Sequence, residues 1–184
     1  SNRDAWQGWA KGGVAGIFVI LHAIFPDSHW PWLAFCGTLA AVNADTWATE
    51  LGVLSKKNPI NLVTGQSLEP GESGGVTSLG TFAAFLASLF VAILAIVFWP
   101  GFLQKPAGAE TWILLASITA AGVFGSVVDS FLGATVQAIY FCPACEKENE
   151  KHPQHTCGRM TELVRGWKWF TNDLVNTFCA FMGA

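Results

Sequence analysis

The chain has 184 residues, of which 52% are hydrophobic and 12% are charged, and its mean hydropathy is positive. A soluble domain of this length seldom carries so few charges, so the composition is typical of a membrane protein. The formal net charge of -3 argues against general nucleic-acid binding, which needs a basic face. The chain opens on Ser1-Asn2-Arg3 without an initiator Met or a signal-peptide pattern, as expected of a fragment.

Four apolar stretches are long enough to be predicted as membrane spans, and a shorter fifth closes the chain. They run from about 8 to 25, 32 to 54, 75 to 99, 110 to 141 and 172 to 184. The fifth reaches about 20 Å of a hydrocarbon core of roughly 30 Å, so we expect a half-helix packed against protein. The predicted fold is an all-α polytopic transmembrane bundle, a single membrane domain over 1–184 with a small zinc-ribbon-like loop at 142–171.

Lys and Arg are distributed unevenly between the two sides of these spans. One side holds Arg3, Lys11, Lys56, Lys57, Lys147, Lys151, Arg159, Arg165 and Lys168. The other side holds Lys105. Because short loops rich in these residues stay in the cytoplasm, the loops at 55–74 and 142–171 are predicted to be cytoplasmic.

Several spans carry acidic residues, although an ionised carboxylate at helix depth costs roughly 3 kcal/mol. Asp45 and Glu50 lie on the second span, Asp129 on the fourth and Asp173 on the last. All lie in the half of their span nearer the predicted cytoplasmic side, so we expect them to meet in one polar chamber that holds Mg²⁺. Two alternatives stay open: the acids only set helix packing, or they line a channel or transporter.

Amides and small residues surround these acids. Gln137 lies two turns beyond Asp129 on nearly the same face, and Asn172 and Asn176 are one turn apart at the start of the last stretch. A stripe of small residues on the fourth span permits close helix approach. It comprises Gly122, Gly125, Ser126, Ser130 and Gly133.

A glycine-rich loop, KKNPINLVTGQSLEPGESGGVTSLGT, runs from Lys56 to Thr81 and ends at the start of the third span. Glycines let backbone N–H groups approach an anion, and the following helix N-terminus is electropositive. The residues expected to bind phosphate are Ser73, Gly74, Gly75 and Thr77. Lys56 and Lys57 are expected to neutralise charge there, although a plain capped turn is the alternative for this pattern.

The segment FCPACEKENEKHPQHTCG contains Cys142-x-x-Cys145 followed by His155-x-Cys157. Three Cys and one His form a set of four soft ligands, which predicts a closed structural zinc site without a catalytic role. His152 competes with His155 as the fourth ligand, and a redox Cys pair is the alternative.

Five motifs in this order resemble an integral membrane family that includes plant phytyl-phosphate kinase and the vertebrate transmembrane protein nineteen. They are NADTWATELG, EPGESGGVTSLGT, GSVVDSFLGATVQ, the Cys/His segment and RGWKWFTNDLVN, and they cover most of the chain from Asn43 onward. Members of that family carry further hydrophobic sequence at the N-terminus. The resemblance implies an isoprenoid monophosphate kinase that converts phytyl or geranylgeranyl phosphate to the diphosphate, with CTP as a plausible nucleoside triphosphate donor.

The kinase hypothesis assigns Mg²⁺ to Asp45, Asp129 and Asp173, with Glu50 as a further ligand or a solvent-facing group. Lys56 or Lys57 neutralises developing charge, and the two Asn residues at 172 and 176 orient a phosphate or a metal-bound water. The expected partners are the nucleotide, the prenyl phosphate lipid and the membrane, and the sequence leaves a homo-oligomer open. The competing functions are a membrane nucleotidyltransferase, a lipid or ion transporter, and a zinc-braced scaffold protein.

The prenyl tail is expected between the spans. Candidate lining residues are Phe82, Phe85, Leu86 and Leu89 on one face of the third span. The alternative, that these four face lipid or pack in the ordinary way, is favoured.

Overall fold

The computed structural model describes the chain from residue 5 to residue 184, apart from the side chains of residues 5–7 and 9–11. Within that range it contains five helices and two small antiparallel sheets. The helices are α1 (Ala5–Ile24), α2 (Trp30–Gly52), α3 (Ser78–Val97), α4 (Ala109–Thr135) and α5 (Asn172–Met182). The strands are β1 (Ile60–Asn61), β2 (Gly75–Val76), β3 (Ile139–Cys142), β4 (Lys147–Asn149) and β5 (Glu162–Arg165).

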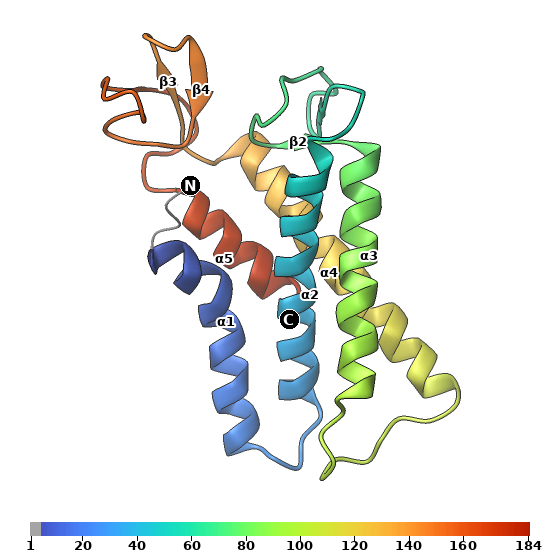
Figure 1. The fold of residues 1–184 in the computed structure, drawn as a ribbon. Coiled ribbons are helices and arrows are strands. Elements are labelled where there is room, and N and C mark those ends of the chain that lie inside the picture. Colours follow the sequence, from blue (N-terminus) through green and yellow to red (C-terminus); the bar gives the residue numbers. More distant parts are fainter. Residues whose placement is uncertain (1–4) are drawn as a thin grey trace.

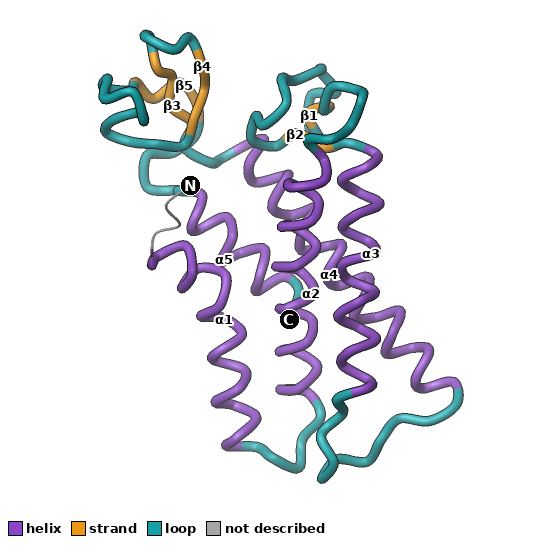
Figure 2. The backbone as a smooth tube through the Cα atoms, in the orientation of Figure 1, coloured by secondary structure: helices purple, strands orange, loops and turns teal. Residues whose placement is uncertain are grey.

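Helix α2 lies at the centre of the bundle and packs against each of the other four helices. Helices α1, α2 and α3 run side by side, α4 crosses behind α2 and α3 at a tilt, and α5 covers only part of the length of the bundle (Figure 1). The β1–β2 unit and the β4-β3-β5 sheet both lie at one end of the bundle, above the helices (Figure 2). That end therefore carries the glycine-rich loop and the loop at 142–171. The connections at 25–29 and 98–108 lie at the opposite end.

The interior of the bundle is built from small residues. Ala40, Ala41 and Ala44 of α2 are fully buried, and a Cβ on Gly122 or Gly125 of α4 would lie within 3 Å of Ala40 or Ala41. Small residues allow helix backbones to approach closely, which is how helices associate in a lipid environment. The buried alanines of α2 and α3 are Ala34, Ala40, Ala41, Ala44, Ala83, Ala84, Ala87, Ala92 and Ala95.

Large apolar side chains mostly point outward. They include Ile20, Phe82, Phe90, Trp112 and Phe124, each at least half exposed. Helices α3 and α4 are the two described helices that are both long enough and apolar enough to cross a membrane. The expectation of a mostly helical fold is thus confirmed at this level.

The expectation of an all-α chain is wrong in two places. The stretch 110–141 does not form one helix: α4 ends at Thr135, and Ile139–Cys142 forms β3. The β-branched and aromatic residues of this segment favour a strand, which pairs with β4 and β5. The third helix begins at Ser78 rather than at 75, because Gly75–Val76 pairs with β1 and the extended Thr77 caps the helix.

Candidate functional site

A cavity of about 680 Å³ opens at the loop-bearing end of the bundle. Helices α2, α3, α4 and α5 and the loop between α2 and α3 contribute most of its wall, α1 adds Gly8, and the Cys/His loop at 142–171 adds Glu150. Its volume lies in the range of small-molecule sites. The polar residues that line it are Asp45, Thr46, Thr49, Glu50, Glu72, Ser73, Thr77, Thr81, Ser126, Asp129, Ser130, Glu150, Asn172 and Asn176.

Most of the site residues predicted from the sequence meet in this cavity. Asp45, on α2, is 8% exposed, and Asn176, on α5, is 6% exposed, so both are held inside the protein. The other predicted residues in the lining are Glu50, Ser73, Gly74, Gly75, Thr77, Asp129 and Asn172. Residues from segments up to 131 positions apart therefore border one space.

Three predicted residues lie outside the lining, each for a local reason. Lys56 and Lys57 are exposed on the loop beyond α2, whose backbone turns at Ser55, where the hydroxyl accepts from the Lys57 N–H at 3.2 Å. Asp173 follows Asn172 by one residue and so points about 100° away from it around α5. The expectation that Asp173 shares a chamber with the other acids is not met in this arrangement.

Gln137 is also outside the lining, yet it touches the site. It is 1% exposed and lies just beyond the end of α4. Its Oε1 accepts a hydrogen bond from Ser73 Oγ at 3.0 Å, and its Nε2 donates to Glu150 Oε1 at 2.7 Å. One buried amide thus joins the glycine-rich loop to the Cys/His loop.

Packing on the last turn of α4 positions the glycine-rich loop. Gly74 has a φ of 82°, and a Cβ there would lie 2.6 Å from Ala134 Cβ and closer still to the Ala134 backbone. Arg165 Nη1 donates to the Ala134 carbonyl, and its Nη2 donates to the Ser73 carbonyl at 3.5 Å. Only glycine satisfies both the backbone angle and the close approach at position 74.

Thr77 acts as the N-cap of α3. Its Oγ1 accepts a hydrogen bond from the Gly80 N–H at 2.9 Å and donates to the Gly52 carbonyl at 3.5 Å. Capping is therefore the structural role of this hydroxyl at the cavity edge, and it fixes where α3 leaves the loop.

Glu72, Glu150 and Arg165 are site residues that the sequence reasoning did not select. Glu72 lies among turn residues, and Glu150 lies in a polar stretch with several other charges. For Arg165, the sequence indicates only a positive charge on the predicted cytoplasmic side. The contacts of Glu150 and Arg165 join residues 13 and 92 positions apart, so no local pattern reveals them.

The lining is strongly acidic. It includes five carboxylates, from Asp45, Glu50, Glu72, Asp129 and Glu150, and no Lys, Arg or His among the lining residues that the structure describes. A polyanion such as a nucleotide would be repelled by these charges on its own. A ligand of that kind must therefore enter with divalent cations.

The acids do not form a preassembled cation site of three or more ligands. Within residues 5–184, the only group of three or more His, Cys, Asp or Glu side chains close enough to share a metal ion is the Cys/His cluster. Mg²⁺ is usually bound by one or two carboxylates together with substrate phosphates and waters. Among the acids that the structure describes in the lining of the cavity, no more than two lie close enough to share one ion.

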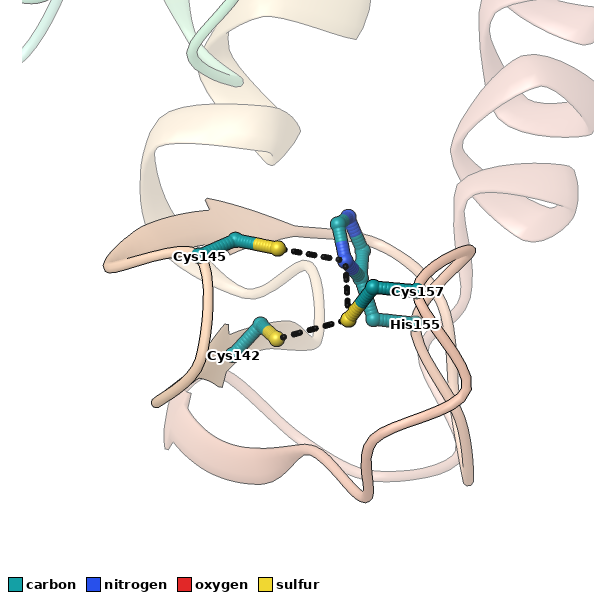
Figure 3. Close-up of side chains that lie close together, drawn as sticks. All are labelled: Cys142, Cys145, His155 and Cys157. Atoms are coloured by element: carbon teal, nitrogen blue, oxygen red, sulfur yellow. Dashed lines mark hydrogen bonds between the residues drawn. The ribbon is translucent and has the colours of Figure 1, made fainter.

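The Cys/His cluster consists of Cys142, Cys145, His155 and Cys157, whose side chains point toward one another (Figure 3). Their ligand atoms all lie within 4.8 Å of one another. Cys142 Sγ is 3.6 Å from Cys157 Sγ, and His155 Nδ1 is 3.4 Å and 3.3 Å from the Sγ atoms of Cys145 and Cys157. A tetrahedral zinc with Zn–S of about 2.3 Å sets ligand separations of about 3.5–3.8 Å. The four residues fit such an ion.

His152 is not part of the cluster. Its ring stacks on Tyr140 with centroids 4.6 Å apart, so His155 is the His of the four-ligand set. The backbone N–H of Arg159 donates to the Cys157 sulfur and lowers the pKa of this thiol to about 6. A hydrogen bond with Cys157 raises the pKa of Cys145 to about 11. The lowered pKa favours the thiolate form of Cys157, which is the form that binds metal.

Comparison with known proteins identifies the family. The family described as integral membrane protein DUF92 matches residues 1–184, the whole chain. The chain belongs to this family. No solved structure matches it.

Three curated relatives are similar to the DUF92 chain. Protein PGR of Arabidopsis thaliana is 34% identical over 113 residues, covering 60% of this chain and 39% of the relative. An uncharacterized membrane protein of Methanocaldococcus jannaschii is 30% identical over 125 residues, covering 68% and 48%. An uncharacterized membrane protein of Synechocystis sp. is 26% identical over 178 residues, covering 96% and 55%. The chain spans about half of the length of these relatives, or less.

The resemblance drawn from the five motifs is confirmed by this membership, including its plant branch. The chain belongs to an integral membrane family, and each of the five motifs contributes residues to the lining of the cavity described above. The activity of the site is a separate question, because a fold does not determine the chemistry it carries.

Proposed function

We propose that the DUF92 chain carries the site of a prenyl-phosphate kinase. It would transfer the γ-phosphoryl group of a nucleoside triphosphate, CTP in the first place, to phytyl or geranylgeranyl phosphate. The observation that carries this proposal is the meeting of Asp45, Asp129 and the turn Ser73-Gly74-Gly75 in one cavity at the loop-bearing end of an apolar bundle. The family resemblance supplies the substrate class.

The reaction needs little covalent chemistry from the protein. A phosphate oxygen of the acceptor attacks the γ-phosphorus, the bond to the β–γ bridging oxygen breaks, and nucleoside diphosphate leaves. The acceptor is already an anion, so no general base is required. Positioning and charge stabilisation then account for most of the rate.

The chain's own residues divide this task. Asp45 and Asp129 would hold Mg²⁺, directly or through water, while the ion also binds the donor phosphates. The backbone N–H groups of Gly74 and Gly75 would bind phosphate oxygens, and Asn172 and Asn176 would orient them. Mg²⁺, when bound, neutralises the charge that develops in phosphoryl transfer.

The arrangement in the membrane is part of the same proposal. We infer a polytopic bundle whose loop-bearing end faces the cytoplasm. The two loops at that end contain Lys56, Lys57 and the basic residues of the Cys/His loop, whereas the loop between α3 and α4, at the other end (Figure 1), contains Lys105. A structural zinc in the Cys/His cluster would brace the loop. The prenyl tail would remain in the bilayer while its phosphate enters the cavity.

The candidate tail-binding face on α3 has little support. Phe82, Phe85 and Leu86 are 59%, 45% and 40% exposed, Leu89 is half-buried, and none of the four lines the cavity. They behave as ordinary outward-facing residues of a membrane helix, which was the favoured alternative.

The test is phosphoryl transfer from γ-labelled CTP and ATP to phytyl and geranylgeranyl phosphate by the purified chain in lipid with Mg²⁺. Asp45→Asn and Asp129→Asn should each lower the rate by at least about a hundredfold, because each removes a charge that holds the cation. Glu110→Gln is the matched control on α4, since Glu110 lies in the first turn of that helix and outside the cavity.

Each competing function gives a different result. Release of pyrophosphate would indicate a nucleotidyltransferase, and movement of substrate across sealed vesicles without nucleotide turnover would indicate a transporter. Absence of diphosphate product from folded wild-type protein, or full activity of both Asn variants, would overturn the kinase proposal.

A further inference from the structure

We propose that Gln137 and Glu150 are positioning residues that fix the Ser73 hydroxyl as a hydrogen-bond donor to Gln137. In this arrangement Ser73 offers the cavity an oxygen acceptor and keeps its hydrogen turned away. An oxygen lone pair can bind a divalent cation. It cannot bind a phosphate oxygen, which is itself an acceptor and needs a donor. The inference rests on the proposed function, because the cation meant is the one that enters with the nucleotide.

The argument begins with the order of donors and acceptors. A carboxylate has no hydrogen to donate, so the Glu150 side chain must face the Nε2 group of Gln137, at 2.7 Å. The Gln137 amide then has its Oε1 toward Ser73 Oγ, at 3.0 Å. Because an amide oxygen only accepts, the Ser73 hydroxyl must donate its single hydrogen to Gln137. The remaining lone pairs of the Ser73 oxygen then face the cavity.

Burial makes this order strict. Gln137 is 1% exposed, so water does not compete for its amide and an exchanged orientation would leave buried groups mismatched. The Gln137 carbonyl lies against Gly166, where no side chain fits, and its N–H donates to the Leu132 carbonyl at 3.1 Å. The backbone of Gln137 is therefore fixed as well as its side chain.

Ser73 lies close to the acid that the proposal assigns to the cation. A Cβ on Gly133 of α4 would lie 2.8 Å from Ser73 Oγ, so the hydroxyl rests on α4 at that glycine. Asp129 precedes Gly133 by four residues, which is one helical turn on the same face. The Ser73 oxygen and the Asp129 carboxylate therefore lie about one turn apart along one wall of the cavity.

The Cys/His loop fixes Glu150 from both sides. Asn149 donates through Nδ2 to the Tyr140 carbonyl at 3.1 Å and accepts from the Lys151 N–H at 2.9 Å. The Lys151 carbonyl in turn accepts from Thr161 Oγ1 at 2.9 Å. Glu150 is exposed in itself, yet its neighbours leave it little freedom. The Cys/His loop thus has a role in the cavity through Glu150, which is not one of the four residues of the Cys/His cluster.

The test measures Mn²⁺ binding by electron paramagnetic resonance, with β,γ-methylene CTP present and without turnover. Ser73→Ala and Glu150→Ala should each weaken Mn²⁺ binding about tenfold or more, the loss expected when one contact to a charged group is removed. Glu150→Gln should stay within a few-fold of wild type, because its amide oxygen still accepts from Gln137. Glu148→Ala is the matched control, an exposed acid of the same loop outside the cavity.

A double-mutant cycle separates positioning from a general structural effect. If Glu150 acts through Ser73, then Glu150→Ala adds nothing in the Ser73→Ala background. Additive losses, or a Glu150→Ala variant that binds Mn²⁺ as wild type does, would overturn the inference. A fall in thermal unfolding temperature shared by the Ala and Gln variants at 150 would do the same, since it would indicate a folding role.

The kinase proposal fails independently of this one. Wild-type protein that binds Mn²⁺ with the nucleotide analogue but forms no prenyl diphosphate would sink the kinase function and leave the orientation of the Ser73 hydroxyl standing. Product formation with unchanged Mn²⁺ binding in Glu150→Ala would do the reverse. No Mn²⁺ binding by wild type would overturn both.

Discussion

Replacement of Gly74 by Ala should open the glycine-rich loop much more often than replacement of Gly71 by Ala. Both glycines lie in the same loop, both line the cavity, and both have positive φ, 82° at Gly74 and 95° at Gly71. The two differ in what surrounds them: nothing lies within 4 Å of a Cβ at 71, whereas a Cβ at 74 meets the backbone of Ala134. Gly71→Ala is therefore a matched control for the backbone strain.

The size of the effect follows from this difference. An L residue in the left-handed region costs about 1–2 kcal/mol, partly offset by about 0.4–1 kcal/mol from the restricted unfolded chain, and both variants share this net cost. Gly74→Ala also forces overpacking against helix backbone, which adds about 1–3 kcal/mol. The loop should then open about 5 to 150 times more often in Gly74→Ala than in Gly71→Ala, at about tenfold per 1.4 kcal/mol.

Hydrogen exchange of the backbone amides at 61–77, measured in lipid or detergent, gives the opening free energy directly. The exchange of α3 amides in the same samples reports whether the bundle itself is intact. Equal exchange in the two variants, or faster exchange in Gly71→Ala, would refute the reasoning that contact with α4 holds the loop.

Three further predictions concern the cluster, the bundle and the outer loop. His155→Ala should lose bound zinc while His152→Ala keeps it, as measured by elemental analysis of the purified chains, because His155 belongs to the four-ligand set and His152 stacks on Tyr140. Gly125→Ala should lower stability by about 1–3 kcal/mol in thermal unfolding, since its Cβ would meet Ala41, whereas Gly16→Ala should be neutral or stabilising because its Cβ meets nothing within 4 Å. Lys56→Ala should raise the KM for nucleotide less than about threefold, an effect that added salt abolishes, because the side chain acts from outside the cavity.

The acids of the apolar helices were accessible to sequence reasoning because a carboxylate in an apolar helix is costly and needs a reason. Asp45 and Asp129 stand out on these grounds alone, and the structure brings them to one cavity. The Cys/His set was accessible for a similar reason, since its spacing matches a known ligand geometry. Both signals are local and chemical.

The part of the site that is formed by long-range contacts could not be predicted from the sequence. Lys56 lies on the same loop as Ser73-Gly74-Gly75, but proximity in sequence did not bring it to the cavity. Gln137 was expected on the face of Asp129, yet α4 ends before it, and its position follows from hydrogen bonds to residues 64 and 13 positions away. The helix end itself depends on strand pairing with β4 and β5, which hydropathy does not reveal.

The alanine-filled interior limits how this fold can be made more robust. A common route to a tougher protein is to fill voids with larger side chains, but backbones this close leave no room for an added methyl group. Added stability must come from the loops between the helices, where a substitution can reduce the conformational entropy of the unfolded chain. Gly101 is a suitable position, because it lies in the turn between α3 and α4, has no positive φ, and has no atom within 4 Å of an added Cβ. Alanine there should raise stability by about 0.4–1 kcal/mol while leaving the bundle and the cavity unchanged.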